Sequence, residues 1–123
     1  MATEIQLTAG LVTLSADSDG MTGGVQDVAD AIDVSAGDVC DLILTLEAVE
    51  GPVDTFVVTI LTGMSRDSES GWYPLGSFAS LTAAGSNDKA RFVGLLKYIR
   101  WKVTNLTGGG AAAFQVRGML RSG

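Results

Sequence analysis

The side chains that could do chemistry in this 123-residue chain begin with its carboxylates. Asp17 and Asp19, followed by Gly20, resemble the start of a calcium loop, but the third ligand and the later glutamate of such a loop are missing. A second group of acids follows, and its spacing alone marks no buried, perturbed pair for acid–base catalysis. We therefore expect a turn, a solvated acidic edge, no metal and no cofactor. The second group is Asp27, Asp30, Asp33, Asp38 and Asp41.

The single cysteine and the lack of histidine limit the remaining chemistry. Cys40 lies in the strand-like segment "GDVCDLILTL", where a small side chain of this kind is usually buried. A catalytic thiolate or serine needs a nearby base, and the chain has no histidine to act as one. Ser65 and Asp67, in "SRDSESGWYPLGSF", therefore have no histidine to complete a triad. We expect a protein that is not an enzyme, with Cys40 in its core.

Charge is divided unevenly along the chain. Residues 1–60 hold eleven acidic and no basic residues, whereas residues 61–123 hold three acidic and eight basic ones. The halves therefore carry −11 and +5, which sum to the net charge of −6. Such a chain is a poor general binder of nucleic acid. Either an acidic and a basic face lie side by side, or strands from the two halves pair and mix the charges.

Strand-like segments recur at short spacing with turn-rich breaks, which is typical of an all-β sandwich or barrel. The apolar runs are far shorter than the roughly 18 residues that span a membrane. An alternative over Gln26–Ala31 is one short helix, because apolar residues there recur at helical spacing. We expect a single domain of about eight strands over residues 11–123, with residues 1–10 as a candidate N-terminal arm. The expected strands are Glu4–Leu7, Leu11–Ser15, Val25–Val34, Val39–Glu47, Thr55–Leu61, Trp72–Phe78, Ala90–Val93, Leu96–Asn105 and Ala113–Leu120.

The last two strands alternate in a way that predicts a shared basic face. In "LKYIRWKVT", Ile99, Trp101 and Val103 point one way and the intervening side chains point the other. The short link "LTGGGAAA" predicts a hairpin with a mobile tip, which would bring the outward side chains of both strands together. That face is either solvated or a contact for an acidic surface, including the acidic half of a neighbouring subunit. Its predicted members are Tyr98, Arg100, Lys102 and Arg117.

The order of features over about Asp54 to Leu120 resembles a known group of proteins. "TFVVTIL" is followed by the turn "GMSRDSESG", a tryptophan, "PLGSFASLTAAG", "LLKYIRWKVT", the Gly/Ala link and "AFQVRGML". This resembles the small capsid-associated proteins of tailed phages, including head decoration (cement) proteins. The resemblance implies a jelly-roll-like antiparallel β-sandwich, a non-enzymatic role, and a homotrimer on the outer surface of the phage capsid. The implied partners are the major capsid protein and further copies of the chain, with no nucleic acid and no membrane.

A second resemblance is to discoidin-type carbohydrate-binding jelly rolls. These also follow a strand with "S.DG..W" and carry "RYIR" before the closing strand. Here the glycine is displaced to Gly71 and "KYIRW" replaces the usual arginine before tyrosine. Trp72, Tyr73 and Tyr98 would be the aromatic side chains that stack on a sugar. A carbohydrate-binding module, a tail component and a head-fibre base are therefore the alternative functions.

The loop in "SRDSESGWYPLGSF" is first of all a connection between two strands. We expect Trp72 or Leu75 to fill the edge of the sandwich there. The second interpretation is that Trp72 and Tyr73 contact a partner.

Overall fold

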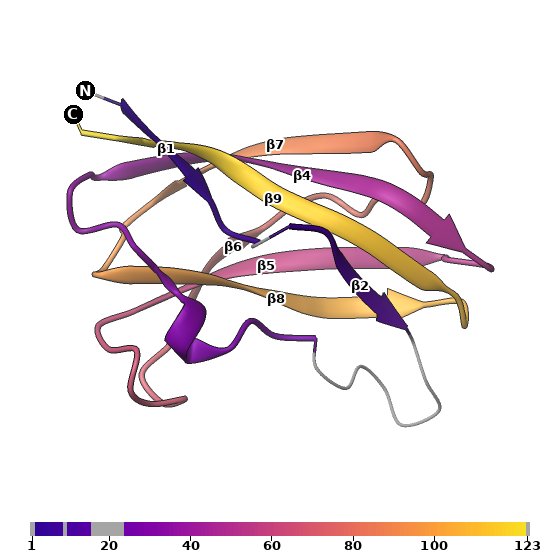
Figure 1. The fold of residues 1–123 in the computed structure, drawn as a ribbon, viewed down its shortest axis with the longest axis horizontal. Coiled ribbons are helices and arrows are strands. Elements are labelled where there is room, and N and C mark those ends of the chain that lie inside the picture. The colour runs from indigo at the N-terminus through magenta and orange to yellow at the C-terminus, as the bar shows by residue number, and fades with distance from the viewer. Residues whose placement is uncertain (1, 9, 16–23, 123) are drawn as a thin grey trace.

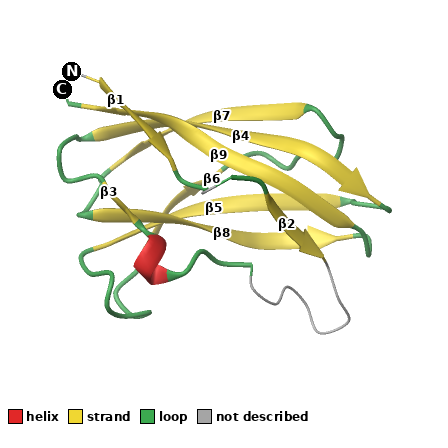
Figure 2. Ribbon diagram, viewed as in Figure 1, coloured by secondary structure: helices red, strands yellow, loops and turns green. Residues whose placement is uncertain are grey.

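The computed structural model describes residues 2–8, 10–15 and 24–122, and it is nearly all β-strand with one short helical turn (Figure 2). The strands form two antiparallel sheets that face each other as a sandwich (Figure 1). The five-stranded sheet contains β1 (Ala2–Gln6), β2 (Val12–Ser15), β4 (Val39–Glu50), β7 (Ser86–Val93) and β9 (Ala111–Arg121). The four-stranded sheet contains β3 (Ile32–Asp33), β5 (Thr55–Gly63), β6 (Tyr73–Ser77) and β8 (Tyr98–Thr107).

The strand order is that of a jelly roll. The sheets read β1-β9-β4-β7 and β3-β8-β5-β6, and β2 continues the β1 edge because it pairs with the other half of β9. With β1 and β2 counted as one interrupted strand, successive strands alternate between the sheets except at β5 and β6, which pair within the four-stranded sheet, and this is the arrangement of two linked Greek keys. The all-β jelly-roll sandwich expected from the sequence is confirmed.

The core lies between the sheets, and side chains alternate into it along the strands. In β4, Leu42, Leu44 and Leu46 are fully buried while the residues between them face outward. Phe114 of β9 lies between two aromatic rings, with centroids 5.3 Å from Phe56 and 5.2 Å from Trp101. These contacts join both sheets through one aromatic cluster.

Most of the expected strands are present, and Val25–Val34 is the main exception. That segment contains an isolated bridge at Val25, the 3-10 helix η1 (Val28–Asp30) and the two-residue strand β3. The Asp27 side chain accepts a hydrogen bond from the backbone N–H of Ala29 and so caps η1. The helical spacing thus produces one turn, because a local side-chain cap competes with strand pairing.

The predicted hairpin of the last two strands is wrong. β8 pairs with β3 and β5, whereas β9 pairs with β1, β2 and β4, so the glycine-rich link crosses from one sheet to the other. The link is packed against the β4–β5 connection, where the Gly110 N–H donates to the Pro52 carbonyl at 2.8 Å. A short link requires only that two strand ends are close. In a sandwich, that also holds across the core.

The segment expected as an N-terminal arm contributes to the sandwich. Residues 2–6 form β1, which pairs with β9 from Ala2 opposite Arg121 to Gln6 opposite Arg117. Ile5 and Leu7 are buried in the core. Ala2 of β1 and Arg121 of β9 therefore lie side by side at one end of the five-stranded sheet (Figure 1).

Candidate partner-contact surfaces

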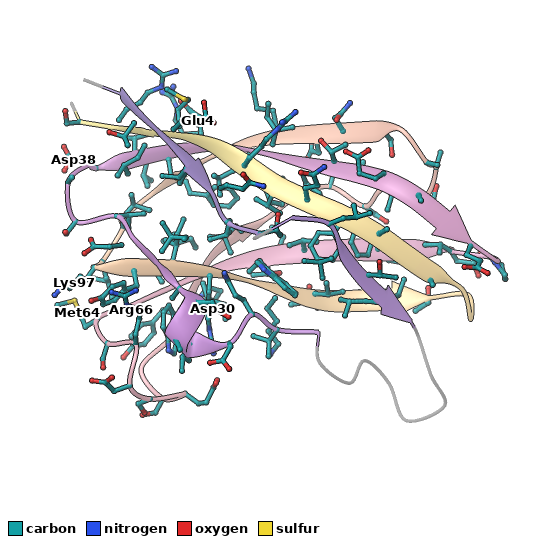
Figure 3. All side chains as sticks on the ribbon, viewed as in Figure 1. Glu4, Asp30, Asp38, Met64, Arg66 and Lys97 are labelled. Atoms are coloured by element: carbon teal, nitrogen blue, oxygen red, sulfur yellow. The ribbon has the colours of Figure 1, made fainter. Side chains whose placement is uncertain are left out.

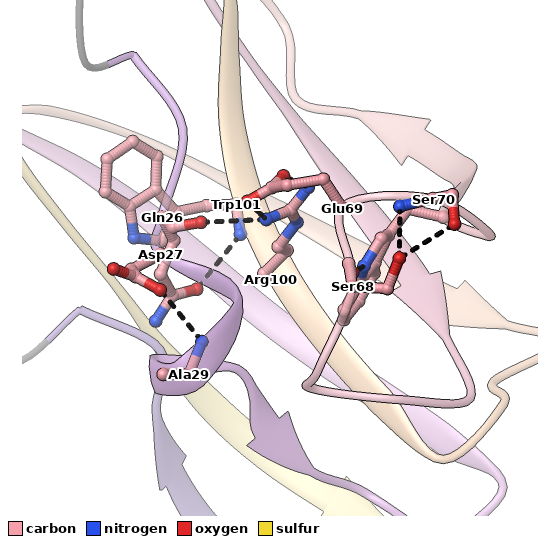
Figure 4. Close-up of polar contacts among 9 residues, drawn as sticks. Gln26, Asp27, Ala29, Ser68, Glu69, Ser70, Arg100 and Trp101 are labelled. Atoms are coloured by element: carbon pink, nitrogen blue, oxygen red, sulfur yellow. Dashed lines mark hydrogen bonds and ion pairs between the residues drawn. The ribbon is translucent and has the colours of Figure 1, made fainter.

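The loop between β5 and β6, residues 64–72, folds back over the outer face of the four-stranded sheet, and we call it the cap loop (Figure 4). Its serines form local turns, since the Ser70 N–H donates to Ser68 Oγ at 3.1 Å. The indole N–H of Trp72 donates to the Ser68 carbonyl at 2.9 Å and closes the loop on itself. The sequence that looked like a simple connection thus has its own internal structure.

Trp72 packs on the outer face of β5 at a glycine. A Cβ atom on Gly63 would lie 2.9 Å from Cδ2 of the indole ring, so the missing side chain admits the ring. The expectation that Trp72 fills the edge between the sheets is therefore wrong. Leu75, the other residue considered for that place, is half-buried and packs against the core.

Arg100 of β8 is the buried centre beneath the cap loop, with an exposed fraction of 4%. Its guanidinium donates to both carboxylate oxygens of Glu69, at 3.3 and 2.8 Å, and to the Gln26 carbonyl at 3.1 Å. It also lies 4.6 Å from the centre of the Trp72 ring. Its Nε is buried with no hydrogen-bond partner among the described residues. Arg100 therefore holds the cap loop through charge and stacking together.

The contact with Arg100 changes the pKa of Glu69. Hydrogen bonds from Arg100 hold the pKa of the Glu69 carboxyl below its usual value, and the charge of Arg100 adds to that effect. Slight burial and the nearby charge of Asp27 act in the opposite direction. The carboxylate is therefore ionised at neutral pH, as the pairing with Arg100 requires.

Tyr98 occupies the neighbouring outward position of β8 and is also covered. Arg66 of the cap loop lies 4.6 Å from its ring centre, and the Lys97 ammonium lies 5.4 Å from it. Figure 3 shows Met64, Arg66 and Lys97 gathered at this end of the sandwich. The Arg66 guanidinium also reaches the Ala31 carbonyl at 3.4 Å, which ties the cap loop to the segment before β3.

The open basic face predicted from the sequence does not exist. Tyr98 and Arg100 do point away from the core, as the alternation predicted, but the cap loop buries them to 9% and 4% exposure. Lys102, further along β8, is exposed. Arg117 is on β9 and therefore belongs to the other sheet. Alternation fixes which way a side chain points and says nothing about a loop that later covers it.

Among the aromatic residues expected to contact a partner, Tyr73 is the most exposed, at 60%. Trp72 beside it is half-buried against β5 and Arg100, and Tyr98 is buried. Met64, at the other end of the cap loop, is 63% exposed. The cap loop thus begins with an exposed methionine and is followed directly by an exposed tyrosine, the first residue of β6.

The outer face of the five-stranded sheet mixes the charges of the two halves of the chain. Asp41 of β4 accepts hydrogen bonds from Arg91 of β7 at 2.7 Å and from Arg121 of β9 at 2.9 Å. Those hydrogen bonds, that of Arg91 first, lower the pKa of the Asp41 carboxyl. Arg117 lies further along this face. Strand pairing between the halves therefore neutralises part of the basic charge.

The sequence analysis did not identify Glu69 and Gln26, which hold Arg100 and so help to position the cap loop. The Gln26 side chain donates to the Leu7 carbonyl at 2.8 Å and accepts from the Trp101 N–H at 3.2 Å. It is buried and connects the N-terminal segment with β8. No sequence signal marks Gln26. A glutamate in the loop after β5 could have suggested Glu69, because β5 pairs with the strand that carries Arg100.

The remaining chemical candidates have local roles or fall outside the described residues. The calcium-like stretch from Asp17 to Gly20 lies outside the described residues. Cys40 is fully buried, as expected, and burial followed by the charge of Asp41 raises the pKa of its thiol to about 12. Asp33 accepts hydrogen bonds from Ser35, which are the main cause of its lowered pKa.

Comparisons of the chain with models of known protein families, with curated proteins and with solved structures find no match. Within the described residues, no helix is long and apolar enough to cross a membrane.

Proposed function

We propose that this chain is a structural virion protein that decorates the outer surface of a phage head as a symmetric oligomer and stabilises the shell. The proposal is supported by the sequence pattern over Asp54 to Leu120 and by a jelly-roll fold, which is common in viral capsid domains. Because this fold also serves other functions, the argument depends on a particular surface. That surface is the cap loop.

The observation that carries the proposal is the preorganised cap loop. Met64 and Tyr73 are more than half exposed, yet the loop between them is held by Arg100, a residue of the sheet itself. A contact surface that is already ordered loses less conformational entropy when it binds. Aromatic and methionine side chains are also enriched where proteins meet. The cap loop is therefore suited to dock on a large protein surface such as the major capsid protein.

Binding of this kind would strengthen the shell by mass action. A protein that binds the assembled shell and not its dissociated subunits raises the free energy needed to rupture the shell. Several identical contacts made by one oligomer multiply this effect. The chain needs no catalytic residues for this role, since its contribution is binding alone.

The test is to look for the protein on purified phage particles released from cells that encode it. We expect mass spectrometry to detect it in particles, and an antibody to reach it on intact heads. Met64→Ala combined with Tyr73→Ala should reduce the amount per particle, whereas Leu11→Ala, which removes a side chain that is 56% exposed elsewhere, should not. Particles that lack the protein, or that contain it only inside the shell, would refute the proposal.

A further inference from the structure

The outer surface of the five-stranded sheet, which we call the open face, has no covering loop among the described residues. Ile43 of β4 is 37% exposed near its centre, and the cross-strand neighbours of Ile43 are Lys89 of β7 and Arg117 of β9. The residues that line its shallow depressions include Asp41, Ile43, Lys89, Arg91, Arg117, Met119 and Arg121. An apolar centre within a charged rim is the usual composition of a protein–protein contact.

The charges of the open face are only partly balanced. Arg91 and Arg121 share the carboxylate of Asp41. Lys89 and Arg117 form no ion pair within the described part of the chain, although Glu4 lies near Arg117. The centre of the open face is therefore flanked by two cations that a partner could neutralise.

An acidic surface lies elsewhere on the same molecule, around η1. Asp27 and Asp30 are exposed at η1, and neither forms an ion pair with a cation of the described residues. We call this pair the acidic rim. Figure 3 shows Asp30 well separated from Glu4, which lines the open face. One molecule thus has two cations without ion pairs at the centre of its open face and two carboxylates without ion pairs at the acidic rim, in different places.

Because the open face and the acidic rim lie apart, their charges favour one kind of contact between two copies of the chain over another. A two-fold contact centred on Ile43 would bring Lys89 and Arg117 against the same cations of the partner copy. Like charges placed together at an interface are strongly unfavourable. A contact between the open face of one copy and the acidic rim of the next pairs opposite charges and is heterologous. Heterologous contacts close into rings or continue as filaments.

We propose that the open face binds the acidic rim of a second copy of this chain, with Asp30 meeting Lys89 or Arg117 around Ile43. The inference deepens the proposed function, on which it rests for its purpose, by assigning one sheet face to the contact between subunits. Where this heterologous contact closes, it produces a cyclic oligomer of three or more subunits and no two-fold dimer.

The experiment uses the isolated full-length protein, with native mass spectrometry and sedimentation over a range of protein and salt concentrations. We expect a cyclic oligomer that weakens as salt rises, because exposed charge pairs are screened. Lys89→Glu with Arg117→Glu should weaken assembly by at least about tenfold, and so should Asp27→Asn with Asp30→Lys. Asparagine keeps the cap of η1 at residue 27. Combining both sets exchanges the charges and should restore much of the assembly.

A matched control and a direct contact measurement complete the test. Asp54→Lys changes a charge on an exposed residue outside both surfaces and should leave assembly unchanged. A zero-length carbodiimide reagent should link Lys89 of one copy to Asp30 of another, as mixed isotope-labelled samples would show. Urea unfolding checks that each variant is folded. A wild-type protein that stays monomeric at high concentration and low salt, a two-fold dimer, or failure of the exchanged pair would overturn the inference. Decoration of particles by such a monomer would leave the proposed function intact.

Discussion

Arg100 and Glu69 form an ion pair in which one partner is buried and the other is not. The guanidinium side of the pair is 4% exposed, whereas the Glu69 side chain is 67% exposed, and their closest atoms are 2.8 Å apart. Removing one of these two residues is therefore expected to affect stability differently from removing the other. Loss of the carboxylate leaves a buried cation without its counter-charge, and loss of the cation leaves a carboxylate that water can solvate.

The first prediction follows from this asymmetry. We expect Glu69→Ala to lower the free energy of unfolding more than Arg100→Met does, because methionine fills the buried space without a charge. Urea unfolding of the two variants gives the comparison. Glu69→Gln should fall between the wild type and Glu69→Ala, since the amide oxygen still accepts a hydrogen bond. If Arg100→Met is the more damaging change, the contacts of Arg100 with Trp72 and Gln26 outweigh its charge.

The sequence predicted the fold well because the fold depends on local patterns. The alternation in β4 and β8 and the turn-rich breaks between strands are readable in any half-buried sheet. The connection from β8 to β9 could not be assigned in the same way. Its length is compatible both with a hairpin and with a crossing between sheets, and only the packing of the whole sandwich selects between them.

The burial of Arg100 by the cap loop could not be predicted from the sequence. Arg100 alternates outward in β8 and carries a charge, so a solvated position was the natural expectation. Its burial depends on Glu69, 31 positions earlier in the chain, and on Trp72, which folds back over the sheet with it. Such a contact has no periodic signature. Tyr73, predicted to contact a partner, is exposed beside the cap loop, and its contact with a partner stays a prediction.

The second prediction concerns the stability of the folded protein at low pH. The pKa values of Glu69 and Asp41 are lowered in the folded protein, so the unfolded chain binds more protons as pH falls through the usual values of 4.5 and 3.8. Their contribution to stability is therefore complete above about pH 5 and is lost progressively below it. Urea midpoints measured from neutral pH to about pH 3 should fall accordingly.

The variant Glu69→Gln isolates one part of this acid effect. It removes the titrating group, so stability should depend less steeply on pH below the usual pKa of Glu69. Asp67→Asn, in the same loop, is the matched control, because the carboxylate of Asp67 forms no ion pair in the described part of the chain. An unchanged slope in Glu69→Gln would show that the Arg100 contact does not govern the acid response.

The third prediction tests how the Trp72 ring packs against Gly63. Gly63→Ala places a Cβ atom 2.9 Å from the ring, so the ring must move, at a cost of about 1–3 kcal/mol in stability. The Trp72 indole N–H resonance should shift and lose its protection from hydrogen exchange. Gly76→Ala is the control, since its Cβ would lie 3.4 Å from the nearest atom, on Phe92. In a Trp72→Ala background, Gly63→Ala should have little further effect. A full additional loss there would place the strain in the backbone.

The last prediction concerns Cys40. Its thiol is fully buried opposite Phe92 of β7 and Leu120 of β9, and its pKa of about 12 leaves almost no thiolate at mildly alkaline pH. We expect iodoacetamide to modify Cys40 only when the protein opens, so labelling should be slow in buffer and fast in urea. Cys40→Ala should cost about 1 kcal/mol, and Cys40→Ser should cost more, because a buried hydroxyl there needs a new hydrogen-bond partner. Rapid labelling of the native protein would mean that β4 separates from its neighbours in solution, and the open face would then not be a fixed surface.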